Sequence, residues 1–383
     1  MNNFIFENGT RFLFGVGCVK EYLASFLTAY GSNVLLVTEA AGQASGAAEE
    51  VQDLLQRSGK QVVSCYAGPF CPRYDQIQQA ARLCRESQAC LILGVGGSAV
   101  LDSCKAISLA VVCRGDLWKN FGELQGVVDI PPLPIGFVAS HLEAGAINGA
   151  AGVLHENRCI WRDYPPCDPK FALLDPAYTL KLPHRELICQ GFSALSGALE
   201  EYLIQSEGMG VSRDLMETLI RGMIQDLRTC WGSPDSEDVR SNLMWRCSLW
   251  GSRFFQLGRR FSFPALPARE AAILSSSDWE EYAEALAVLL MALCLRESEQ
   301  HPEVMSQMAV RIWEIPGKKC SPEAAQASVH AFAEFLRDLK LPAEYTELKP
   351  SQQKRLAELQ DIGEICTLIP CQEEGRDGCA RVS

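Results

Sequence analysis

A cluster of glycines between an apolar run and a helical run is the strongest candidate for chemistry in this chain. Residues 91–105 read LILGVGGSAVLDSCK, so a buried strand is predicted to end at Gly96-Gly97 and a helix to begin directly after them. Glycine lets the backbone approach a phosphate closely, and the first N–H groups of a helix attract anions. The Ser98 hydroxyl adds a donor. The pattern favours a phosphate-binding loop; a tight turn without a ligand is the alternative.

An acidic residue follows an earlier predicted strand. Glu39 comes directly after the apolar run Asn33–Thr38, where doubly wound sheets often place a carboxylate against a ribose hydroxyl. A carboxylate there would repel a 2′-phosphate, which slightly favours NAD over NADP. The alternative is a surface glutamate at the end of a strand.

The elements that must position these residues alternate along the first half of the chain. Apolar, β-rich runs cover residues 33–38, 61–65, 89–93 and 134–139, and helical spacing covers residues 46–58, 74–87 and 101–113. This alternation predicts right-handed crossovers and a parallel sheet that is covered on both faces. Near the start, runs at 3–6 and 11–14 flank Asn8-Gly9, which predicts a β-hairpin.

The character of the sequence changes after Pro183. Helical periodicity covers residues 187–205, 216–227, 242–257, 279–295, 303–313 and 322–339. Ser321-Pro322 is typical of a helix start, because Pro fits the first helical position. We expect an α/β domain over residues 1–182 and an all-helical domain over residues 183–383, with a ligand site in the cleft between them.

Composition and charge narrow the classes of partner. The formal net charge of −12 argues against nucleic-acid and anionic-membrane partners, which need basic patches. No signal peptide and no membrane-spanning run is recognised. The 17 cysteines include no CxxC pair, which argues against zinc ribbons and thioredoxin-type sites. We expect a cytoplasmic protein in which most cysteines are small buried apolar residues.

Several motifs resemble those of the iron-containing alcohol dehydrogenases, in particular the butanol dehydrogenase branch. The segment 94–105 resembles the family loop GxGGGSxxDxxK and keeps Asp102 and Lys105, with Ser98 in place of the third glycine. Residues 14–17 (FGVG) and 169–183 (PKFALLDPAYTLKLP) resemble two further family motifs. The resemblance implies a dehydroquinate synthase-like fold, in which an α/β Rossmann-like dinucleotide-binding domain precedes an all-α domain. It also implies that Gly96, Gly97, Ser98, Asp102 and Lys105 bind NAD or NADP, and Glu39 joins them as the candidate ribose contact.

The same resemblance marks four metal-ligand positions, and none of them carries a usual ligand. Residues 191–200 resemble the family motif GxDALxHxxE, with Ser193 and Gly197 in place of the aspartate and the first histidine. The two later histidine positions fall on Leu266 and Tyr282. We therefore expect neither iron nor zinc at the family site.

Other residues near the expected cleft also differ from the family. Around residues 145–148 the threonine, serine and glutamate of the family's TGSE loop are missing. Glutamates 200, 201 and 284 lie near the cleft, where solvated helix faces are expected for them. The histidines are His141, His155, His184, His301 and His330, and each is expected at the surface or with its hydrogen bonds satisfied. Without a metal, a side chain must move the substrate proton, and Tyr282 is the candidate general acid; filling of the emptied metal cavity is its alternative role.

We expect an NAD(P)-linked oxidoreductase that resembles butanol dehydrogenases and acts on a small alcohol or aldehyde without the usual metal site. The alternative is a catalytically inactive family member that serves as a partner, regulator or nucleotide sensor. A lyase-like reaction on the dehydroquinate synthase scaffold is disfavoured, because those enzymes also depend on a metal. The resemblance further implies a homodimer or a hetero-oligomer with a relative.

Overall fold

The computed structural model describes residues 3–39, 45–123, 131–142, 147–204, 210–257, 267–316 and 321–359. Its first half is built on a six-stranded sheet in the order β1-β8-β5-β4-β2-β3, and every neighbouring pair is parallel. The strands are β1 (Arg11–Phe14), β2 (Asn33–Thr38), β3 (Gln61–Tyr66), β4 (Leu91–Gly96), β5 (Ile135–Ala139) and β8 (Phe171–Leu174). The predicted parallel sheet is confirmed.

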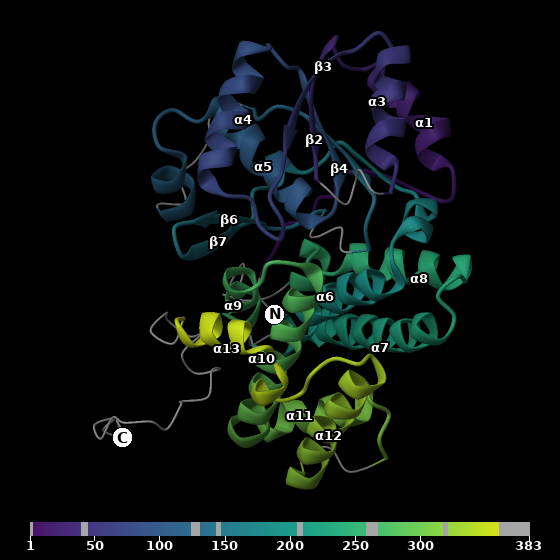
Figure 1. The fold of residues 1–383 in the computed structure, drawn as a ribbon, viewed down its shortest axis with the longest axis vertical. Coiled ribbons are helices and arrows are strands. Elements are labelled where there is room, and N and C mark those ends of the chain that lie inside the picture. Colours follow the sequence, from purple (N-terminus) through teal and green to yellow (C-terminus); the bar gives the residue numbers. More distant parts are fainter. Residues whose placement is uncertain are drawn as a thin grey trace.

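Helices cover both faces of this sheet, as the alternation along β2 requires (Figure 1). Val34 and Leu36 pack in one core cluster with α1 (Cys18–Leu27) and α3 (Ala47–Arg57). Leu35 and Val37 belong to the other cluster, together with α4 (Tyr74–Glu86) and α5 (Ser98–Val112). Successive side chains of a strand point to opposite faces, so a continuous apolar strand feeds two cores.

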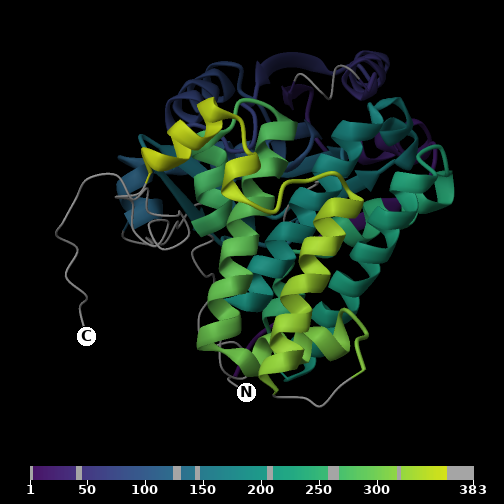
Figure 2. The same ribbon diagram turned by 60° about the horizontal axis from the view of Figure 1, so that its bottom comes forward.

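From Pro183 onward the described residues contain helices and no strand. They are α6 (His184–Leu203), α7 (Gly210–Gly232), α8 (Glu237–Leu249), α9 (Pro267–Ser275), α10 (Trp279–Gln300), α11 (Pro302–Arg311), α12 (Pro322–Asp338) and α13 (Pro350–Ala357). Helix α6 is buried along almost its whole length and packs against α7 and α10. In Figure 2 the yellow α12 runs beside the green helices that precede it. The predicted helix start is confirmed, because Ser321 accepts the Ala324 N–H.

The structure corrects one strand prediction and adds one hairpin that was not predicted. The N-terminal hairpin is wrong: Asn8 Oδ1 accepts the Thr10 N–H, and β1 pairs in parallel with β8. The Thr10 hydroxyl donates to Pro169 O, which sets that register. A hairpin of β6 (Ala151–His155) and β7 (Arg158–Arg162) was not predicted. Its turn holds Glu156 at φ 54, a left-handed conformation for which glutamate gives no sequence signal.

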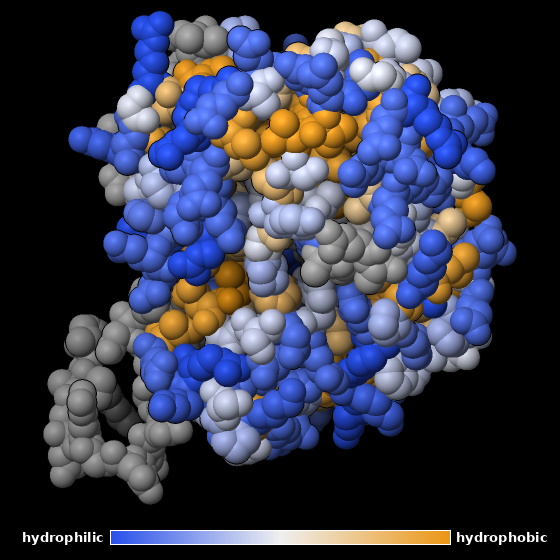
Figure 3. All heavy atoms as spheres, turned by 45° about the horizontal axis from the view of Figure 1, so that its top comes forward, coloured by the Kyte–Doolittle hydropathy of each residue, from blue (hydrophilic) through white to orange (hydrophobic). Residues whose placement is uncertain are grey.

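The polarity of the surface and the burial of the cysteines agree with what the composition predicts. Figure 3 shows hydrophilic residues over most of the visible face, with separate hydrophobic areas between them. In the part of the chain that the structure describes, no helix is long and apolar enough to cross a membrane. Most of the described cysteines are buried, as predicted for small apolar residues.

A buried ion network joins the two halves of the chain. Arg253, in the short helix η4 (Arg253–Gln256), holds both carboxylate oxygens of Asp168 at 2.7 Å and Asp163 Oδ2 at 2.6 Å. Its backbone N–H donates to Asn148 O. Lys105 Nζ lies 3.9 Å from Asp168 Oδ1, on the side of the sheet domain. Paired hydrogen bonds between a guanidinium and a carboxylate fix both distance and angle.

The substitution Arg253→Met tests this network. It should lower the free energy of unfolding by about 3–5 kcal/mol, because the buried Asp168 would keep only the longer contact with Lys105 and the half-buried Asp163 would lose its guanidinium partner. Urea unfolding followed by circular dichroism measures the change. The control is Arg57→Met, whose exposed pair with Asp53 should contribute less than about 1 kcal/mol. Equal effects of the two substitutions would contradict a central role for Arg253.

Candidate functional site

The glycine loop has the predicted strand-loop-helix geometry. Strand β4 ends at Gly96, Gly97 is the N-cap, and α5 begins at Ser98. A Cβ on Gly96 would lie 2.3 Å from Glu39 Oε1 and 2.4 Å from Val100 Cγ2. The backbone therefore approaches its neighbours at a distance that only glycine allows.

Glu39 reaches this loop from the end of β2. Its Oε1 accepts the Gly97 N–H at 2.5 Å, and the residue is only 8% exposed. The alternative of a surface glutamate is therefore wrong. A side-chain anion satisfies an N–H at the helix start, which is where the sequence predicts a phosphate to bind. Contact of Glu39 with a ribose stays a prediction.

His141 is a site residue that the sequence analysis missed. It follows β5 at the carboxyl edge of the sheet and is fully buried. Its Nδ1 lies 3.1 Å from the Ser140 hydroxyl and 3.4 Å from Glu39 Oε1. Its Nε2 has no hydrogen-bond partner among the described residues. The expectation of a surface or satisfied histidine is therefore wrong here, because one ring nitrogen is buried without a partner.

The other predicted loop residues hold a neighbouring segment. Asp102 Oδ2 accepts the Gly152 N–H at 2.9 Å, and Lys105 Nζ donates to Gly149 O at 2.8 Å. Burial lowers the pKa of Lys105, and the nearby carboxylate of Asp168 opposes this shift. Both side chains thereby fix α5 against the start of β6. Ser98 is buried at the first position of α5. Cofactor contacts of these three residues stay predictions.

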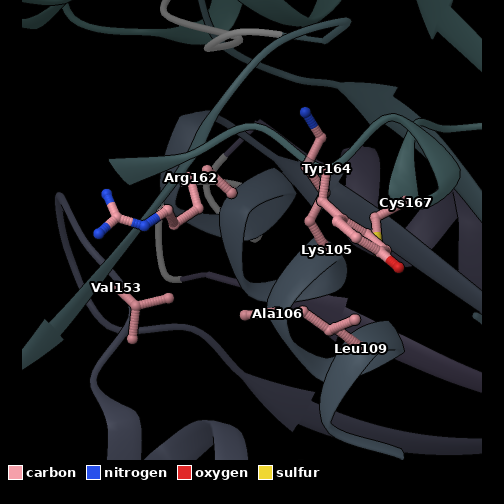
Figure 4. A pocket seen from close by; sticks show the side chains of 8 residues that line it. Lys105, Ala106, Leu109, Val153, Arg162, Tyr164 and Cys167 are labelled. Carbon is pink, nitrogen blue, oxygen red and sulfur yellow. The ribbon is translucent and has the colours of Figure 1, made fainter. Parts of the chain in front are cut away.

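A small pocket lies against α5. It is lined by Lys105, Ala106, Leu109, Ala151, Val153, Arg162, Tyr164 and Cys167. Figure 4 shows that the Lys105 amine and the Arg162 guanidinium point in different directions. Most of the other lining side chains are apolar. A reaction centre needs polar groups that converge on one point, and this pocket lacks them.

The first two predicted metal positions lie on α6, where other side chains take up the space. A Cβ on Gly197 would lie 2.3 Å from Trp250 Cζ3 and 2.4 Å from Cη2. The indole of Trp250 therefore occupies the direction in which a ligand side chain would project. Ser193, one turn earlier, is buried, and its hydroxyl has no hydrogen-bond partner in the described part of the chain. Leu266, the third position, lies outside the described residues.

A buried arginine stands beside these two positions. Arg269 Nη1 donates to Ser193 O at 3.3 Å, and its guanidinium carbon lies 5.0 Å from the centre of the Trp250 ring. A guanidinium over an indole face is a favourable cation–π contact. Arg269, a residue of the protein, therefore supplies a positive charge beside the predicted metal positions Ser193 and Gly197.

Tyr282, the fourth position, lies in an aromatic layer between the two halves of the chain. Its ring stacks on Phe70 with 4.6 Å between centroids, and Trp279 meets it edge-on at 5.8 Å. The residue is 1% exposed. This packing is what the cavity-filling role requires, and the role as a general acid stays a prediction.

These residues do not fit a divalent ion. Among the described residues, no three His, Cys, Asp or Glu side chains come together as a metal-binding group. The indole of Trp250 and the guanidinium of Arg269 stand where donor atoms would be needed. Iron and zinc require several nitrogen, oxygen or sulfur donors at once. We therefore derive no chemical step through a metal.

Glu200 connects α6 to the arginine. It is fully buried and accepts the Ala268 N–H at 2.7 Å and the Arg269 N–H at 3.3 Å, so it caps the first turn of α9. Burial raises its pKa to about 8, although both backbone N–H groups and the Arg269 charge act in the opposite direction. Glu201 is also buried, whereas Glu284 is half-buried. The expected solvated face is therefore wrong for Glu200 and Glu201.

Comparison with known proteins agrees with this architecture. The family model for iron-containing alcohol dehydrogenases matches residues 9–176. The NADH-dependent butanol dehydrogenase A of Clostridium acetobutylicum is 23% identical, with 92% of this chain and 91% of that protein covered. The NADPH-dependent aldehyde reductase YqhD of Escherichia coli is 25% identical, with coverages of 91% and 89%. The chain is therefore similar to iron-containing alcohol dehydrogenases, by the family model over residues 9–176 and by relatives of 23–25% identity over most of its length.

Solved structures of similar proteins share the fold of this chain. The crystal structure of the NADH-dependent butanol dehydrogenase A of Thermotoga maritima matches with a TM-score of 0.81 at 21% identity. The match covers 96% of this chain and 92% of the Thermotoga maritima chain. The cofactor-free aldehyde reductase YqhD matches with a TM-score of 0.76 at 24% identity, with coverages of 94% and 93%. The predicted fold class is thereby confirmed.

The substitution Glu200→Gln tests the burial of this carboxyl group. Its folded-state pKa of about 8 lies above the ordinary value of 4.5, so the folded protein holds the proton more tightly than the unfolded chain. The free energy of unfolding should therefore fall as the pH rises between these two values, and the contribution is fully lost above the folded-state pKa. Glutamine cannot ionise, so the variant should lose this part of the pH dependence.

Urea unfolding at several pH values between the two pKa values measures the effect. The control is Glu86→Gln, since Glu86 is exposed on α4 and its substitution should leave the slope unchanged. A slope for Glu200→Gln equal to that of the unmodified protein would show that Glu200 ionises in the folded state as it does in the unfolded chain.

Proposed function

We propose that this chain is an NAD(P)-linked oxidoreductase that acts on a small alcohol or aldehyde without a divalent ion at the family's metal position. The observation that carries the proposal is the loop Gly96–Ser98, where a buried strand meets a helix start and no side chain fits on Gly96. The names of the relatives support the reaction class, since they include NADH-dependent butanol dehydrogenases and an NADPH-dependent aldehyde reductase.

The residues around the loop fit a dinucleotide. The Gly97 N–H and the first turn of α5 offer donors and the positive end of a helix dipole to a phosphate. Glu39 now accepts the Gly97 N–H, so its carboxylate must turn away when a phosphate oxygen takes that donor. A ribose hydroxyl is a donor that the freed carboxylate can accept, which supports NAD over NADP. The bound nicotinamide would supply or accept the hydride.

Side chains of this protein must stabilise the charge on the substrate oxygen and supply its proton. Reduction of an aldehyde places negative charge on the carbonyl oxygen, and a proton must reach that oxygen. In relatives with an ion, the ion's charge would stabilise the oxygen. Here the fixed positive charge of Arg269 lies beside Ser193 and Trp250. These contacts support a site that works with protein groups alone.

The first test is a titration of EDTA-treated protein with NADH and with NADPH. Quenching of tryptophan emission should show saturable binding in the micromolar range, tighter for NADH. Gly96→Ala should abolish binding, because its methyl group would overlap Glu39 and Val100. The control is Gly232→Ala, where nothing lies within 4 Å of the added methyl group. Absence of binding to either nucleotide would refute the oxidoreductase and favour a partner or regulatory role.

A graft of the family ligands tests the metal-free site. Ser193→Asp, Gly197→His, Leu266→His and Tyr282→His together should still bind no stoichiometric Co²⁺, because Trp250 fills the space beside residue 197. Adding Trp250→Ala and Arg269→Met should create a site for one Co²⁺ per chain. The visible absorption of bound Co²⁺ measures this, and circular dichroism checks that both variants fold. Stoichiometric Co²⁺ in the unmodified protein, or in the graft that keeps Trp250, would contradict the proposal.

A further inference from the structure

We propose that His141, held by Glu39, is the residue that gives the proton to the substrate oxygen. The inference rests on the proposed function and names the group that replaces the metal's part in proton transfer. Neither the family comparison nor the sequence motifs point to His141. Four observations of the structure carry it: burial, an unpartnered ring nitrogen, a carboxylate on the other nitrogen, and position.

The first two observations concern the ring itself. His141 is fully buried, and within the described residues its Nε2 meets no hydrogen-bond partner. A buried polar atom without a partner destabilises the folded protein, because it has lost its hydrogen bonds to water. A protein retains such a cost most readily where a ligand completes the bond. His141 Nε2 is therefore the atom that a bound substrate or cofactor would satisfy.

The third observation is the orientation of the ring. Nδ1 lies 3.4 Å from Glu39 Oε1 and 3.1 Å from the Ser140 hydroxyl. A carboxylate on one ring nitrogen fixes the tautomer and favours the imidazolium that forms during proton transfer, as in catalytic Asp–His pairs. Glu39 is the carboxylate that pairs with the ring in the described structure. In the cofactor complex, one oxygen of Glu39 would keep this contact with Nδ1 after the carboxylate has left the Gly97 N–H, and the other oxygen would accept the ribose hydroxyl.

The fourth observation is where the ring lies. The backbone N–H of Ser140 donates to Gly96 O, so His141 is next to the glycine loop Gly96–Ser98. The ring centre also lies 6.5 Å from that of Trp279, which begins α10 and contacts Tyr282. His141 therefore stands between the sheet domain and the helical domain. This is the junction at which the proposed function puts cofactor and substrate together.

The proton transfer balances without any further reactant. The carbonyl carbon takes the hydride, the electron pair of the C=O π bond moves to oxygen, and oxygen takes the proton from Nε2 of the His141 imidazolium. The imidazole becomes neutral and regains its proton from water. In alcohol oxidation the neutral Nε2 accepts the hydroxyl proton in the reverse sense.

The activity test uses the full-length, EDTA-treated protein with short-chain aldehydes and NADH. His141→Gln should lower kcat by at least about a hundredfold, the lower bound for loss of a general acid. The NADH Kd should change by less than about threefold. The decline of kcat with rising pH, expected when an imidazolium donates the proton, should disappear in the variant. His330→Gln is the control, since His330 is exposed on α12.

A second readout is independent of turnover. ¹⁵N NMR of the imidazoles follows Nε2 of His141 while NADH and then a short alkyl amide, an unreactive mimic of an aldehyde, are added. The His141 signal should move on addition of the amide, and that of His330 should not. An unmoved His141 signal, or a kcat of His141→Gln within about threefold of the unmodified protein, overturns the inference. Loss of NADH binding in the unmodified protein would instead refute the proposed function.

Discussion

The grip of Arg253 on Asp163 and Asp168 is the interaction on which the rest of the site depends. It pins the short turn after α8 to the sheet domain. Trp250 lies three residues earlier, and Gly251 makes the bend between them at φ 71. Because the turn is fixed, the indole of Trp250 is held against Gly197. The ion pairs of Arg253 thus hold the indole of Trp250 in its place beside α6 in the helical domain.

Further packing follows from that indole. Arg269 lies over the face of Trp250, and Glu200 holds the first turn of α9, which carries Arg269. The three side chains come from α6, α9 and the turn after α8, so they tie together elements that are distant in sequence. A buried guanidinium is always charged, unlike a metal site that can lose its ion. The helical domain therefore keeps a constant positive charge at this point.

The sequence was a good guide wherever a local pattern sets the structure. The apolar run of β2 and the glycines after β4 predicted the sheet and the loop, because strand periodicity and backbone freedom are local properties. Ser193 and Gly197 were correctly placed on one helix by the family motif.

Contacts between residues far apart in the sequence could not be predicted from local patterns. Nothing near Trp250 or Arg269 in the sequence shows that they meet residues 193–197, more than fifty positions away. The burial of Glu200 and the pairing of His141 with Glu39 likewise arise only when separate elements pack together. The one available hint for His141 was its place after a predicted strand, at the edge where parallel sheets bind ligands.

The bond between Glu39 and the Gly97 N–H has a thermodynamic consequence. The helix start is already occupied by an anion that is part of the chain. Binding of any other anion there is therefore an exchange, and its free energy is a difference between two anions competing for one donor. The apparent affinity is reduced by the fraction of molecules in which the carboxylate has withdrawn. The Glu39 carboxylate thus acts as an intramolecular competitive inhibitor of anion binding. Because it is part of the same chain, its effective concentration does not change when the protein is diluted.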